Sequence, residues 1–105
     1  MSKEIKVEEM AKELDEKLIP YLSWQSADVK DDYEACEYVA AADAAIHDLG
    51  AVRADLPEQL LSQIELLIDA IRNENDEWNI RFVDHMEKGY KQLKERFDLT
   101  SGKKP

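Results

Sequence analysis

The chain has 105 residues, of which 44% are hydrophobic, and its formal net charge is −10. This length suits a single domain, since domains of roughly 100 to 150 residues are the commonest. Three glycines and three prolines are too few for the frequent turns of a β-sandwich or β-barrel. We therefore expect one all-α domain over residues 1–99, followed by a disordered C-terminal tail over residues 100–105.

The acidic balance restricts the partners that the chain could bind. Nucleic acids and anionic membranes both attract basic surfaces, so we expect neither as a partner. A basic protein is the partner that this charge favours. The first nine residues include three glutamates and no run of eighteen apolar residues occurs, so we expect a cytoplasmic protein without a signal peptide or membrane span.

Two helices are expected in the first half of the chain. Apolar residues recur at helical spacing from Lys3 to Leu18, and Pro20 should end or kink that helix because it lacks a backbone donor. A second helix is expected over residues 28–49, closed by Gly50. It includes five alanines within six consecutive positions, which favour helix formation and allow a neighbouring helix to approach closely.

Two further helices are expected in the second half. The third starts at Pro57, and the fourth runs from about residue 76 to Phe97 with Trp78 facing inward. Four amphipathic helices with short connections predict a compact up-down four-helix bundle. The alternative is one unbroken helix from Pro57 to Phe97, which gives three helices and a dimer that covers the long apolar side. Both a monomer and a homodimer stay open.

Acidic residues concentrate in the second predicted helix. Residues 26–50 contain seven acidic side chains and one basic side chain, a net charge of −6. Tyrosines flank these acids, and aromatic residues beside charged ones are common in protein interfaces. The alternative is a solvated face that only keeps the protein soluble. The predicted partner-binding residues are Asp28, Asp31, Asp32, Glu34 and Tyr38.

Candidate catalytic and metal-binding residues are sparse. Asp43 and His47 lie one helical turn apart, but two ligands make a weak metal site. Cys36 falls on the apolar stripe of the second helix, where a buried thiol would be inert. We therefore expect no catalytic residue, no metal and no cofactor, and a protein that is not an enzyme.

Two short patterns are similar to those of enzyme families. The paired glutamates Glu13 with Glu16 and Glu34 with Glu37 resemble in spacing the magnesium-binding motifs of all-helical nucleotide pyrophosphohydrolases. That resemblance implies a small metal-dependent hydrolase as an alternative function. The pairing of Arg81 with His85 resembles the Arg-His signature of small helical ribonucleases, with a shorter spacing.

In size, charge and number of helices, the chain resembles small acidic bacterial immunity and antitoxin-type proteins. The resemblance implies a protein-binding module that neutralises a basic toxic enzyme with carboxylates and aromatic side chains. The alternatives are the metal-dependent hydrolase above and a structural helical dimer.

Overall fold

The computed structural model describes the backbone of residues 2–22, 27–74 and 77–100, and the side chains of residues 7–22, 29–74 and 77–99. These residues form helices and no strand. The α-helices are α1 (Ser2–Leu18), α2 (Ala27–Glu34), α3 (Tyr38–Ala51), α4 (Glu58–Glu74) and α5 (Val83–Thr100). Two 3₁₀ helices are η1 (Ile19–Tyr21) and η2 (Asn79–Phe82).

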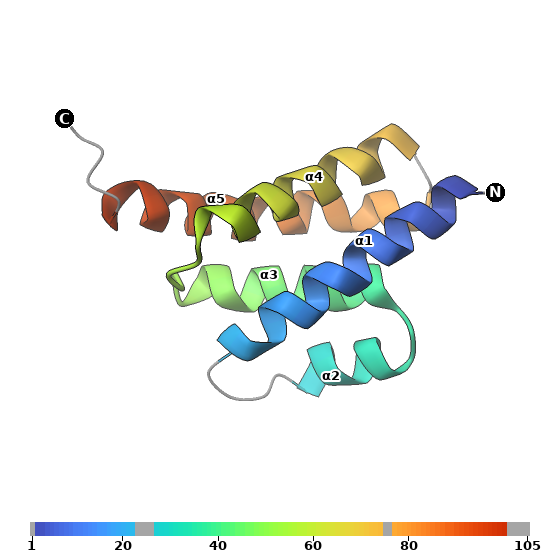
Figure 1. The fold of residues 1–105 in the computed structure, drawn as a ribbon, viewed down its shortest axis with the longest axis horizontal. Coiled ribbons are helices and arrows are strands. Elements are labelled where there is room, and N and C mark those ends of the chain that lie inside the picture. Colours follow the sequence, from blue (N-terminus) through green and yellow to red (C-terminus); the bar gives the residue numbers. More distant parts are fainter. Residues whose placement is uncertain (1, 23–26, 75–76, 101–105) are drawn as a thin grey trace.

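The four longest helices form the bundle, and α2 lies against one side of it (Figure 1). Helix α1 packs on α3 and α4, and α5 packs on the same two helices. Consecutive helices along the chain run in opposite directions (Figure 1). The predicted all-α bundle is thereby confirmed.

Apolar side chains from every α-helix fill the centre of the bundle. Helix α3 is the central element, because it contacts α1, α2 and α5. Its alanines allow these close contacts, since Ala41, Ala42 and Ala45 are fully buried and their short side chains let the neighbouring helices approach. The largest fully buried apolar residues are Leu14, Leu18, Val29, Ile46, Leu49, Ile64, Leu67, Ile71, Met86 and Leu93.

The second predicted helix is in fact two helices, α2 and α3, and this expectation was wrong. Cys36 has a φ of 64°, which ends α2 in the left-handed conformation. The amide of Cys36 donates to the carbonyl of Tyr33 at 3.0 Å, and the amide of Glu37 donates to that of Asp32 at 2.8 Å. These two bonds form a Schellman motif, in which glycine usually occupies the position of Cys36. The chain then turns into α3.

The end of α3 repeats the same motif three residues beyond the predicted position. Arg53 has a φ of 50°, its amide donates to the carbonyl of Gly50, and the amide of Ala54 donates to that of Leu49. Gly50 therefore lies inside α3 and does not close it. Both motifs place a non-glycine residue at the left-handed position, so no glycine marks either helix end, and Gly50 marked the end of α3 three residues too early.

Helices α4 and α5 are separate and pack against each other, so the alternative of one unbroken helix was also wrong. Arg72 of α4 forms an ion pair with Glu87 of α5. The Tyr90 hydroxyl of α5 donates a hydrogen bond to Glu65 of α4 at 3.3 Å. The residues of the first pair are 15 positions apart in the sequence, and those of the second pair are 25 positions apart. Such pairs meet only because the chain reverses direction between the two helices.

Trp78 precedes η2 and does not face the core, contrary to expectation. Its side chain is 63% exposed, and the guanidinium of Arg81 lies 4.9 Å from the centre of its ring. This distance is typical of a cation–π contact. The connection through η2 turns Trp78 outward, whereas a regular helix across this segment would have turned it inward.

The helix ends near the termini agree in part with expectation. Helix α1 ends at Leu18, and Pro20 lies in η1 immediately after it, as predicted. The tail was expected to begin at Thr100, but Thr100 is the last residue of α5, and the rest of the expected tail, residues 101–105, lies outside the described residues. In the described part of the chain, no helix combines the length and apolar character needed to cross a bilayer.

Candidate functional site

Helix α2 contributes little to the core and presents mostly polar side chains. Of its described side chains, residues 29–34, Val29 alone is fully buried. Asp31 and Glu34 are exposed, and Asp32 is half-buried. Val29 and the half-buried Tyr33 therefore attach to the bundle a short helix whose other side is exposed to solvent.

The predicted partner-binding residues fall into three groups. Asp31 and Glu34 are exposed, as a binding role requires. Asp32 and Tyr38 are half-buried, and the ring of Tyr38 packs edge-to-face on Tyr33 with the ring centres 5.5 Å apart. Asp28 belongs to α2, but its side chain lies outside those that the structure describes.

Cys36 is exposed in the turn between α2 and α3, so its predicted burial in the core was wrong. The cause is the left-handed backbone at this position, which takes the side chain off the apolar stripe. A hydrogen bond with the Cys36 side chain, together with burial, raises the pKa of the Tyr38 hydroxyl. Cys36 and Tyr38 therefore belong to the same surface as the acids of α2.

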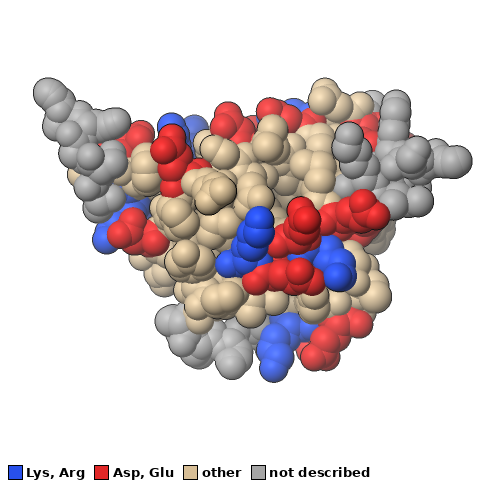
Figure 2. Space-filling model, viewed as in Figure 1, with Lys and Arg blue, Asp and Glu red and all other residues tan. Residues whose placement is uncertain are grey.

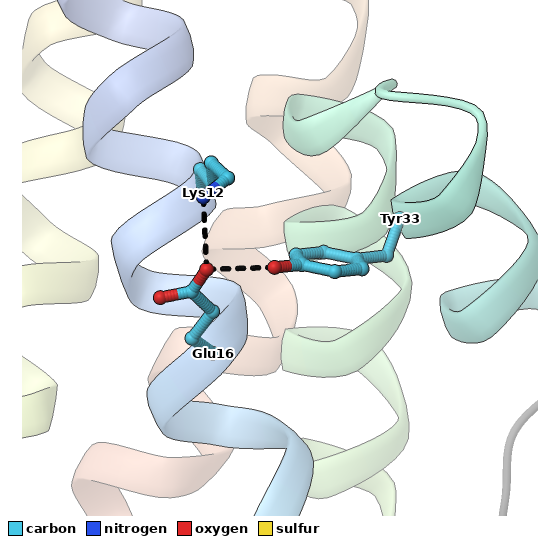
Figure 3. Close-up of polar contacts among 3 residues, drawn as sticks. All are labelled: Lys12, Glu16 and Tyr33. Atoms are coloured by element: carbon cyan, nitrogen blue, oxygen red, sulfur yellow. Dashed lines mark hydrogen bonds and ion pairs between the residues drawn. The ribbon is translucent and has the colours of Figure 1, made fainter.

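Glu16 links α1 to α2. Its carboxylate accepts a hydrogen bond from the Tyr33 hydroxyl at 2.6 Å and forms an ion pair with Lys12 at 3.1 Å (Figure 3). These two donors, first the Tyr33 hydroxyl and then Lys12, lower the pKa of Glu16. The polar side of α1 thus continues directly into the surface of α2.

Asp15 is a buried carboxyl group that the sequence analysis missed. It is fully buried, and neither of its oxygens has a hydrogen-bond partner among the described residues. Burial raises its pKa to about 8, and the negative charges of Glu16, Glu8 and Asp32 add to the effect. A signal was present in the sequence, because Asp15 lies four residues after Ala11 and three before Leu18, on the apolar stripe.

A hollow of about 170 Å³ lies between α1 and α4, beside the polar side of α1. Figure 2 shows charged side chains of both signs over α1 and an uncharged surface between α1 and α4. A second hollow, larger at about 410 Å³ and more open to solvent, follows the charged side of α1 and shares Met10 and Glu13 with the first. The first hollow is lined by Met10, Glu13, Leu14, Gln63 and Leu66.

The predicted metal pair Asp43 and His47 is part of a different arrangement. Asp43 is largely buried, and its carboxylate accepts a hydrogen bond from His85 Nδ1 of α5, at 2.9 Å from Oδ1. The imidazole of His47 stacks on that of His85, with ring centres 4.2 Å apart. Burial raises the pKa of Asp43, against the opposing effect of the histidines. Across the residues that the structure describes, no three His, Cys, Asp or Glu side chains converge to hold a metal ion.

The residues with enzyme-like spacing have other contacts. Glu16 binds Lys12 and Tyr33, and Arg81 packs on Trp78 rather than beside His85. The polar groups that the structure brings together are therefore the acids of α1 and α2 and, separately, the Asp43, His85 and His47 cluster. Comparison of the chain with protein-family models, curated proteins and solved structures gives no significant match.

Proposed function

We propose that this chain is an acidic protein-binding module that recognises a basic partner, in the manner of an immunity or antitoxin-type protein that neutralises a basic enzyme. The observation that carries the proposal is the exposure of the acidic side chains of α2. This helix buries only Val29 among its described side chains and presents Asp31 and Glu34 to solvent. A helix that adds so little to the core is better explained by binding a partner at the surface than by packing.

The charges support a basic partner. Lys30 is the single basic residue of α2, whereas four of its eight residues are acidic. Like charges on one short helix repel one another, so this composition does not serve helix stability. An excess of one sign accelerates the encounter with a partner of the opposite sign, most strongly at low ionic strength.

The turn after α2 supplies the aromatic component of such a surface. Tyr33 and Tyr38 are held in place by each other, and Tyr33 is also held by its bond to Glu16. Aromatic side chains that are already fixed lose little conformational entropy when a partner binds. The acids would therefore attract the partner, and the two tyrosines would contact it.

The experiment compares three forms of the chain as bait for the proteins of its own cells. Wild type is compared with the double variant Asp31→Lys/Glu34→Lys and with Asp48→Lys/Asp69→Lys, in which the same change of charge lies on exposed residues of α3 and α4. Captured proteins are identified by mass spectrometry, purified, and their association rates measured at two salt concentrations. We expect a basic protein whose association slows at least tenfold for the α2 variant and much less for the control.

Two outcomes would contradict the proposal. A partner that associates equally fast with wild type and with the α2 variant does not use this surface. A partner whose rate falls equally for both variants responds only to the net charge of the chain. Circular dichroism of all three forms checks that the bundle is intact.

A further inference from the structure

The hollow between α1 and α4 has three chemical properties that together describe its occupant. Its apolar wall is formed by Met10, Leu14 and Leu66. Leu66 is 58% exposed, so a large apolar side chain of α4 is left uncovered at the rim. An occupant with an apolar stem would cover this surface, and removing its methylene groups from water favours binding.

The second property is an acceptor without a donor. The side-chain Oε1 of Gln63, which lines the hollow, is buried and has no hydrogen-bond partner among the described residues. A buried acceptor without a partner lowers the stability of the folded chain, and a donor that binds it restores that loss. The terminal amide torsion of glutamine is soft, so this oxygen can reach a donor in the hollow by rotation of the amide group.

The third property is negative charge. Glu13 lines both this hollow and the adjoining one, where Glu9 and Glu16 are its neighbours. Lys12 lies among them but is engaged with Glu16. Glu13 itself is exposed on α1 and forms no ion pair with another described residue. A cationic donor in the hollow would therefore have the carboxylate of Glu13 and the side-chain amide of Gln63 among the groups around it.

We infer that this hollow binds an arginine side chain of a basic partner protein. An arginine has an apolar stem and a flat guanidinium with five donors, so it matches the apolar wall, the carbonyl of Gln63 and the carboxylate of Glu13. This inference rests on the proposed function, since it names the anchor that the partner inserts. The acids of α2 attract the partner from a distance, and the hollow between α1 and α4 holds one of its side chains.

The inference is tested by NMR on the ¹⁵N-labelled chain, titrated with a short capped peptide that contains one arginine between two leucines. The control peptide has citrulline in place of arginine, which keeps the shape and removes the charge. We expect the arginine peptide to shift the amide signals of Met10, Glu13 and Leu66 and the side-chain amide of Gln63. Binding of a single side chain should be in the millimolar range, and citrulline should bind at least tenfold more weakly.

Two variants test whether the arginine peptide binds at the hollow. Glu13→Lys should weaken peptide binding at least tenfold, and Leu66→Ser, at an exposed position that the fold tolerates, should weaken it about threefold. The matched control for charge is Asp48→Lys on α3, which should bind as wild type does. Equal binding of arginine and citrulline peptides, or signal shifts at α2 and none at the hollow, would overturn the inference.

The two proposals fail in different ways. If the arginine peptide binds at the hollow but no basic protein associates through α2, the proposed function is wrong and the hollow keeps only its preference for an arginine side chain. If a basic partner associates through α2 but binds the Glu13→Lys chain with unchanged affinity, the assignment of the hollow is wrong and the proposed function stands.

Discussion

Gly50 of α3 lies directly against Gly89 of α5. A Cβ atom on Gly50 would be 2.7 Å from the backbone oxygen of Gly89, and one on Gly89 would be 2.6 Å from the backbone oxygen of Ile46. Both distances are far shorter than a normal contact, and the atoms that would be met belong to the backbone of the other helix. These two glycines therefore set how closely α3 and α5 approach.

Substitution of either glycine by alanine should destabilise the protein. Alanine gains about 1 kcal/mol over glycine in a helix, but the two helices must separate, and overpacking of this kind costs about 1–3 kcal/mol. These figures leave a net loss of about 0–2 kcal/mol. Because the clash is with backbone atoms, we expect the upper part of that range for Gly50→Ala and for Gly89→Ala, measured by urea unfolding. Gln59→Ala, at an exposed position of α4, is the control and should change stability by less than about 0.5 kcal/mol. A stabilised Gly89→Ala protein would show that the close approach is not needed.

Asp15 should make the protein less stable as the pH rises. Its pKa is about 8 in the folded chain and 3.8 as an ordinary value, so between these limits the folded state holds a proton that the unfolded state has lost. Stability is then fully present below pH 4 and falls by up to about 1.4 kcal/mol for each pH unit between pH 4 and 8. Asp15→Asn removes this titration, so the variant should unfold at a higher urea concentration than wild type at pH 8.

The comparison with Asp15→Asn separates this effect from other titrating groups. Asp43 also has a raised pKa, which changes stability in the same direction, but it is present in both proteins. The difference between the two unfolding free energies, measured from pH 5 to pH 8, therefore reports on Asp15 alone. A difference that is constant with pH would show that Asp15 ionises normally in the folded chain.

His85 should hold Asp43 in place across the contact between α3 and α5. His85→Ala removes the donor to a largely buried carboxylate, which costs about 1–3 kcal/mol. It should also raise the pKa of Asp43 further, because the hydrogen bond to His85 lowers it. The ¹³C shift of the Asp43 carboxyl group measures that pKa. His47→Ala leaves the hydrogen bond intact and should have the smaller effect on both quantities.

The helices could be predicted from the sequence because their apolar residues recur at a regular spacing. Val7, Leu14 and Leu18 are buried as that spacing requires, and so are Ile64 and Ile71. The division between α2 and α3 could not be predicted in this way. It depends on a left-handed backbone at Cys36, which is a rare conformation for a residue with a side chain.

The candidate site could be predicted only where it lies within one helix. The exposure of Asp31 and Glu34 follows from the charge of α2, and the structure agrees. The hollow requires Met10 and Gln63, which lie 53 positions apart in the sequence and meet only when α1 packs on α4. The pair of Asp43 and His85 depends in the same way on the packing of α3 against α5.

The last prediction concerns the bond that joins α1 to α2. Tyr33→Phe removes the hydroxyl that donates to Glu16, while the ring stays beside Tyr38. Because this hydrogen bond is the largest cause of the lowered pKa of Glu16, that pKa should rise toward its ordinary value. Lys12→Met removes the second donor together with its positive charge, and it should also raise the pKa of Glu16. Carboxyl ¹³C titration of the three proteins gives both changes. An unchanged Glu16 pKa in Tyr33→Phe would show that the Tyr33 hydroxyl does not bind Glu16 in solution, and that this contact does not hold α2 to α1.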